Sequence, residues 1–142
     1  MFSIKTRKNV MSNIINGIES FMYANIYPSN IVNGFIILLF HWIIVGWTFA
    51  YIVVGKIDAL FFMCVSTWIL IFALHVYFHG CILTKVEKHL WQADDWCGPW
   101  SLPFKLLEYN NVSVTSGLAQ NIFICWAIAI TIFVAVKIIY YI

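Results

Sequence analysis

The chain has 142 residues, of which 63% are hydrophobic and only 10% are charged. Soluble domains carry about 25% charged residues, so this sequence has too little polar surface for a particle surrounded by water alone. Its net charge of +2 provides no basic stripe for phosphates, which argues against a nucleic-acid partner. We therefore expect an all-α integral membrane protein whose solvent includes the lipid bilayer.

The N-terminal segment, residues 1–30, is basic and then amphipathic. Within residues 9–23, apolar side chains recur three and four positions apart, which predicts a helix with one apolar face. Such a helix lies in the membrane interface or packs on the protein's own helices, and the sequence leaves both possibilities open. Pro28 should end this helix, and Ser29 or Asn30 can cap the next one.

Residues 31–142 are expected to form a membrane domain of three transmembrane helices. The spans are predicted at 31–54, 59–78 and 121–142. The first is about 36 Å long as a helix, which is enough to cross the hydrocarbon core with some tilt. A very short turn joins the first two spans, so these should run antiparallel.

The distribution of basic residues predicts the orientation in the membrane. One side should hold six of them and the other side two: Lys5, Arg7, Lys8, Lys85, Lys88 and Lys105 against Lys56 and Lys137. By the positive-inside rule, the N-terminus and the loop over residues 79–117 are inside and the C-terminus is outside.

The loop between the second and third spans contains the most specific local pattern. Thr84 followed by Glu87 forms a capping box, which predicts a short interfacial helix beginning at Thr84. We expect Val86 and Leu90 to face the membrane and Glu87 to face water. Tryptophans in the rest of the loop are typical of headgroup depth, so the loop should lie on the bilayer.

A resemblance to known proteins lies in this region. The segment from His75 to Leu90, with its Cys-x-Leu-Thr-x-x-Glu pattern at Cys81–Glu87, resembles small uncharacterised multi-span membrane proteins of bacteria and giant DNA viruses. The stretch 102–107 is similar more loosely. The resemblance implies a three- or four-helix membrane protein and brings no established activity.

Two histidines inside the predicted spans are candidate cofactor ligands. His41 lies near the middle of the first span, and His75 lies close to the inner end of the second. In an antiparallel hairpin they are offset by about one turn, which allows axial ligation of haem b. A histidine at such depth should be neutral and can equally serve as a hydrogen-bonding group between helices. We expect its partner to be Ser66, Thr67 or Cys125.

Other groupings of reactive side chains favour structural interpretations. Cys97-Gly98-Pro99 resembles a thioredoxin motif, but Trp100 occupies the position of the resolving thiol. Four loop residues with suitable ligand atoms have spacings that match no tight zinc pattern: His79, Cys81, His89 and Cys97. We therefore predict no catalytic residues, no metal site and no enzymatic activity.

The first functional hypothesis is a structural or accessory membrane protein without a cofactor. It would pack against other integral membrane proteins, within an oligomer or a larger complex of a viral, host or organellar inner membrane. The excess of isoleucine over leucine, typical of AT-rich genomes, favours a viral or organellar origin. The alternative is a membrane-anchor subunit carrying haem b or quinone, as in succinate dehydrogenase, with His41 and His75 as ligands.

Overall fold

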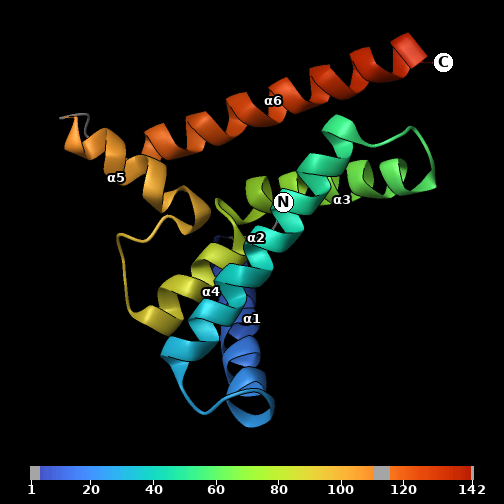
Figure 1. The fold of residues 1–142 in the computed structure, drawn as a ribbon. Helices are drawn as coiled ribbons and strands as arrows, with labels where there is room; N and C mark the ends of the chain where they lie inside the picture. The colour runs from blue at the N-terminus through green and yellow to red at the C-terminus, as the bar shows by residue number, and fades with distance from the viewer. Residues whose placement is uncertain (1–3, 111–115, 142) are drawn as a thin grey trace. The chain divides into compact units, whose positions relative to one another are not determined.

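The computed structural model describes residues 4–110 and 116–141, and all secondary structure in these ranges is helical. The helices follow in the order α1 (Ile4–Asn25), α2 (Asn30–Val54), α3 (Ala59–Phe78), α4 (Ile82–Trp91), the short 3-10 helix η1 (Gly98–Trp100), α5 (Ser101–Tyr109) and α6 (Ser116–Tyr141) (Figure 1). The all-α class is therefore confirmed. The chain divides into two compact units.

Three of the helices are long and apolar enough to cross a membrane. They are Asn30–Val54, Ala59–Phe78 and Gln120–Tyr141. The predicted span 59–78 coincides with α3, and α2 begins one residue before the predicted span. The predicted third span falls within α6, apart from its last residue, which lies outside the described residues. The helix α5, in the loop before it, was not predicted.

Local hydrogen bonds explain where the second span begins and ends. Asp58 caps α3, because its carboxylate accepts a 2.9 Å hydrogen bond from the amide of Phe61. At the other end, His79 and Gly80 both have positive φ, and the amide of Gly80 returns to the carbonyl of His75 at 2.9 Å. This left-handed turn stops the helix, so that α4 is a separate element.

The first unit comprises Met1–Ile43 and Leu74–Ser101, with the described part starting at residue 4. Its core contains Met22 of α1, Ile37 of α2, and Val86 and Leu90 of α4. Helices α1 and α4 lie side by side (Figure 1). In the structure α1 thus packs on the protein's own helices, while its predicted amphipathic, interfacial character stays a prediction.

Helix α4 differs from the sequence prediction in two ways. It begins at Ile82 with Cys81 as its N-cap, so the predicted start at Thr84 is wrong by two residues. The prediction that Glu87 faces water is also wrong, because its side chain is fully buried. Val86 and Leu90 pack into the core of the first unit, and Glu87 shares their buried face since three and four positions separate neighbours on a helix.

The second unit comprises Ile44–Ala73 and Leu102–Ile142, of which residues 111–115 and 142 lie outside the described part. Its core is apolar and aromatic, made by Ile52, Phe61, Cys64, Trp68 and Ile130. Trp68 of α3 meets Trp126 of α6 edge to face, with ring centroids 4.7 Å apart. Lys137 of α6 donates hydrogen bonds to carbonyls at the end of α2, including Ile52 at 2.8 Å and Gly55 at 2.7 Å.

Candidate functional site

The candidate site lies in the first unit, where α4 runs antiparallel along the first half of α2. At one end of this contact, the indole of Trp91 donates a 3.1 Å hydrogen bond to the carbonyl of Ile31. At the other end, His41 of α2 meets Cys81 and Glu87. The helical pairing therefore brings together residues that are 40 and 46 positions apart in the sequence.

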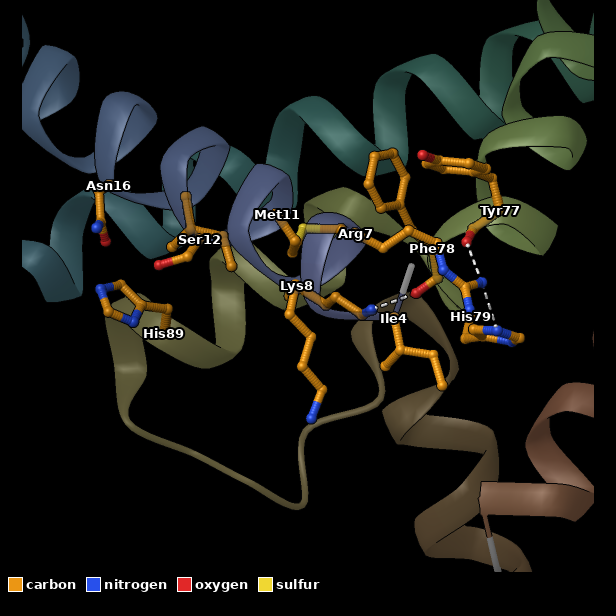
Figure 2. A pocket seen from close by; sticks show the side chains of 12 residues that line it. Ile4, Arg7, Lys8, Met11, Ser12, Asn16, Tyr77, Phe78, His79 and His89 are labelled. Carbon is orange, nitrogen blue, oxygen red and sulfur yellow. Dashed lines mark hydrogen bonds between the residues drawn. The ribbon is translucent and has the colours of Figure 1, made fainter. Parts of the chain in front are cut away.

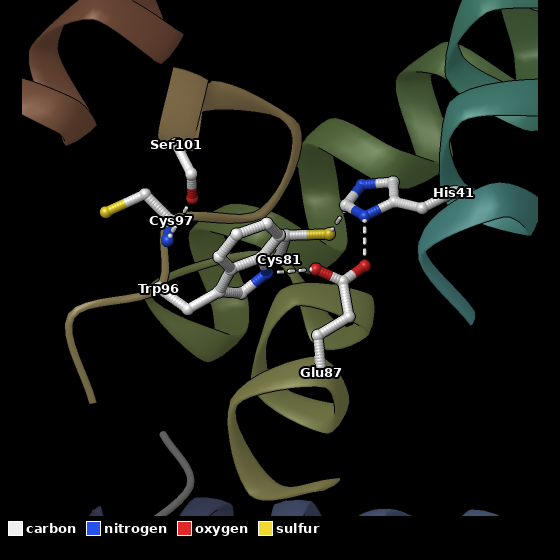
Figure 3. Close-up of polar contacts among 6 residues, drawn as sticks. All are labelled: His41, Cys81, Glu87, Trp96, Cys97 and Ser101. Carbon is white, nitrogen blue, oxygen red and sulfur yellow. Dashed lines mark hydrogen bonds and ion pairs between the residues drawn. The ribbon is translucent and has the colours of Figure 1, made fainter. Parts of the chain in front are cut away.

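Three reactive side chains form a chain of polar contacts (Figure 3). The sulfur of Cys81 lies 3.4 Å from Nε2 of His41, and Nδ1 of the same ring lies 2.9 Å from Oε1 of Glu87. The other carboxylate oxygen of Glu87 accepts a 2.6 Å hydrogen bond from the indole N–H of Trp96. The order is thiol, imidazole, carboxylate, indole, and each polar atom in it has a partner.

The inner residues of this series of contacts are buried. Glu87 is 0% exposed and His41 is 5% exposed, whereas Cys81 at the turn before α4 is only partly buried. A buried carboxylate is stable when its oxygens accept hydrogen bonds, and here His41 and Trp96 supply them. The inner members are thus shielded from water, while the thiol end lies nearer the surface.

The surroundings of Cys81 favour its thiolate. Burial by itself raises the pKa of this thiol. The hydrogen bond to His41, the charge of that ring and the first amides of α4, from Thr84 and Leu83, lower it more strongly. The net pKa of Cys81 is therefore below its ordinary value.

Two glycines let α4 and the loop after it pack closely. A Cβ at Gly34 of α2 would run into the ring of Trp91. Gly98 has a φ of +63°, and a Cβ there would run into the side chain of Thr84. Thr84 is therefore a packing position in the first turn of α4, and no side-chain hydrogen bond caps this helix.

The predicted hydrogen-bond partner of His41 is wrong, because its ring contacts Glu87 and Cys81 of α4 instead of Ser66, Thr67 or Cys125. The prediction overlooked α4 because its buried face was taken to contact lipid. His75, the other candidate haem ligand, is half-buried in the last turn of α3. Both ring nitrogens of His41 are in contact with protein groups, so iron ligation would have to displace Glu87 or Cys81.

In the part of the chain that the structure describes, no group of three His, Cys, Asp or Glu side chains is arranged to hold a metal ion. The contacts of His41, Cys81 and Glu87 run in series, because the sulfur contacts one ring nitrogen of His41 and the carboxylate contacts the other (Figure 3). Of the predicted zinc candidates, His89 instead contacts Glu19 of α1 at 2.8 Å. Cys97 lies 3.5 Å from the carbonyl of Asp95.

The arrangement defines a class of site. A thiol next to an imidazole that is oriented by a carboxylate is the arrangement used for nucleophilic catalysis by cysteine. In this chain, it occurs in an all-helical protein with three helices able to span a membrane. Comparisons of the chain with protein-family models, with curated proteins and with solved structures found no match.

The sequence indicated other roles for three members of this site, and their combination was not predicted. His41 was predicted to form a hydrogen bond between helices or, in the alternative, to bind haem, and Cys81 belonged to the zinc candidates. Glu87 was assigned to a capping box. The available signal was the position of Glu87 between Val86 and Leu90 on a short helix, because a carboxylate among core positions requires a buried partner.

Proposed function

We propose that the protein is a membrane-embedded acyl-transfer protein that uses Cys81 as its nucleophile. His41 acts as the acid and base, and Glu87 holds the imidazole in the orientation that presents Nε2 to the sulfur. The observation that carries this proposal is the continuous contact from sulfur to imidazole to carboxylate, at 3.4 Å and 2.9 Å. Reactive side chains clustered in this way, with the pKa of the thiol lowered by its neighbours, are typical of functional sites.

The reaction proceeds in two balanced halves. The Cys81 thiolate attacks the carbonyl carbon of a thioester or ester, and the bond to the leaving group breaks. The leaving thiol or alcohol takes the proton from the His41 imidazolium, so the acyl group remains on sulfur as a thioester. In the second half, neutral His41 accepts the proton of water, an alcohol or an amine as that acceptor attacks the thioester, and the Cys81 thiolate is released.

The backbone at the start of α4 supports this chemistry. The first amides of a helix have no acceptor within the helix, and the α4 helix begins directly after Cys81. Amides in this position stabilise negative charge, both on the thiolate and on the oxygen of a tetrahedral intermediate.

Acyl transfer requires one thiol, whereas thiol–disulfide exchange requires two. All four cysteines are free, and Cys81 contacts His41 rather than another sulfur. The single thiol at this site therefore favours acyl chemistry over redox chemistry.

Mass spectrometry of the purified full-length protein tests the proposal, with octanoyl-coenzyme A as the acyl donor. We expect a hydroxylamine-sensitive octanoyl group on the peptide that contains Cys81. Cys97→Ser, which removes a partly buried thiol of the same unit, should leave its rate unchanged. His41→Gln should slow acylation at least about 100-fold, the usual minimum effect of removing a general acid or base. Acylation of Cys97 instead of Cys81, or equal rates with and without His41, would overturn the proposal.

The sequence led us to expect a non-enzymatic accessory protein, and one observation favours that function as a second candidate. Gly46 and Ala50 form a small-xxx-small pair on α2, both residues are exposed, and a Cβ at Gly46 would meet nothing within 4 Å. Such pairs allow close approach of a helix from another membrane protein. Co-purification in mild detergent, lost in Gly46→Leu and kept in an acylation-deficient Cys81→Ser protein, would support this accessory role.

The haem or quinone alternative stays a prediction. An optical spectrum of the purified protein tests it through the Soret band of a haem. His41→Gln should abolish such a band if His41 is an iron ligand.

A further inference from the structure

A second site lies in the first unit, on the side of α4 that faces α1. A cavity of about 420 Å³ opens between α1, the end of α3 and α4 (Figure 2). This volume is within the range of small-molecule sites. Neither Cys81 nor His41 lines the cavity, so it is separate from the thiol site.

The cavity is positively charged. Arg7 and Lys8 of α1 and Lys85 of α4 line it, with His79 and His89, and the lining contains no carboxylate. Arg7 donates to the carbonyl of Tyr77 at 3.3 Å, and Lys85 donates to the carbonyl of Phe78 at 2.6 Å. These acceptors are neutral, so the hydrogen bonds position the two cations without cancelling their charge.

Carboxylates elsewhere in the unit do not neutralise this cluster. The carboxylate of Glu19 of α1 contacts Nε2 of His89 at 2.8 Å and accepts a 2.7 Å hydrogen bond from the side-chain amide of Asn30. Among the described residues, no carboxylate forms an ion pair with Arg7, Lys8 or Lys85. Three cations around one cavity, none of them in an ion pair with a carboxylate of the described residues, indicate an anionic ligand.

The other lining groups indicate which anion. Ile4, Met11 and Ile15 of α1 give the cavity an apolar wall, and Ser12 and Asn16 add polar groups beside it. Phe78 is the last residue of α3, one of the three helices able to span a membrane. A basic cavity at the end of such a helix lies where lipid headgroups are found, and basic pockets of this kind bind anionic headgroups.

We infer that this cavity binds the phosphate headgroup of an anionic phospholipid. The cations hold the phosphate, and the apolar wall contacts the start of the acyl chains. The inference does not depend on the chemistry proposed for Cys81. Lipid binding should be unchanged in Cys81→Ser, so its failure and the failure of acyl transfer are separate results.

Native mass spectrometry tests the inference on the full-length protein in a neutral detergent. Equal amounts of phosphatidylglycerol and phosphatidylcholine with identical acyl chains are added, and retention of each lipid is measured. We expect the wild-type protein to retain phosphatidylglycerol preferentially. Lys8→Gln should reduce this preference roughly fivefold, and the double variant Arg7→Gln/Lys8→Gln roughly 25-fold, as expected for loss of one and two cations near an anionic headgroup.

Lys56→Gln is the matched control, because it removes the same charge from the exposed turn between α2 and α3. It should keep the full preference. Lys8 is exposed and has no hydrogen bond among the described residues, so Lys8→Gln is expected to fold normally. Equal retention of the two lipids by wild type, or the same loss in Lys8→Gln and Lys56→Gln, would overturn the inference.

A further arm separates a lipid from a soluble phosphate ligand. Inorganic phosphate and glycerol 3-phosphate are added at millimolar concentration to the lipid-bound protein. We expect phosphatidylglycerol to remain bound, because neither competitor occupies the apolar wall. Complete displacement by either competitor would show that the cavity recognises phosphate alone, and would overturn the assignment to a lipid.

Discussion

The two units of this protein stabilise helix packing in different ways. In the first unit, a fully buried glutamate, a buried histidine and a tryptophan lie within the contact between helices. In the second unit, aliphatic and aromatic side chains dominate the core, the buried Thr48 donates only to carbonyls of its own helix, and Lys137 contacts carbonyls at a helix end. A largely apolar core suffices for packing in the second unit, whereas the first unit buries a network of hydrogen-bonded polar and ionisable side chains.

Removing Glu87 should produce the largest loss of stability. Glu87→Ala leaves His41 and the indole of Trp96 without their acceptor inside the first unit. Breaking such a buried pair costs about 3–5 kcal/mol. Denaturant unfolding in detergent measures the change, with Glu108→Ala, at an exposed position of α5, as the control. A cost below about 1 kcal/mol would show that the buried network is not needed for folding.

Two glycines of the same helix provide an intermediate test. Gly34 lies in the first unit against the ring of Trp91, whereas Gly46 lies in the second unit with open space beside it. Gly34→Ala should cost about 1–3 kcal/mol through overpacking. Gly46→Ala should be neutral or slightly stabilising, because alanine favours the helix. Equal thermal shifts for the two variants would contradict the close approach of α4 to α2.

Removing the polar contacts of Lys137 in the second unit should have the smallest effect on stability. Lys137 donates to carbonyls at the C-terminal end of α2 and lies 5.1 Å from the centroid of the Phe61 ring. Lys137→Met should cost about 1–2 kcal/mol, the range for a cation at a partly buried helix end. Lys105→Met, which removes an exposed cation of α5, is the control for lost charge. Equal losses in the free energy of unfolding for the two variants would show that the hydrogen bonds of Lys137 do not contribute to stability.

The sequence predicted the spans well because their signal is local. A long apolar run bounded by polar turn residues defines a transmembrane helix without reference to any other part of the chain. The limits of α3 were predicted correctly for this reason, since Asp58 and Gly80 stand at its two ends. The orientation in the membrane and the accessory function stay predictions.

The candidate site depended on information that is not local. Glu87 has the same spacing from Thr84 whether it caps a helix or lies in a core, and the sequence alone favoured the cap. The contact with His41 joins positions 46 residues apart, and it forms because α4 folds back along α2. The site was not predicted because the apolar face of α4 was expected to contact lipid, whereas it packs on the protein.

The pH dependence of Cys81 alkylation tests whether His41 activates this thiol. Because the folded protein favours the thiolate, Cys81 adds stability as the pH rises toward the ordinary thiol pKa. This contribution is lost as the pH falls through the lower pKa of the folded state. Residue-resolved mass spectrometry with iodoacetamide gives the midpoint for Cys81 in the wild type and in His41→Gln.

We expect a wild-type midpoint below about 8.5, the ordinary pKa of a cysteine thiol. His41→Gln should move the midpoint upward, because the effect of burial, which raises the pKa, is then opposed less strongly. A wild-type midpoint at or above the ordinary value, or the same midpoint in both proteins, would contradict a thiol activated by His41.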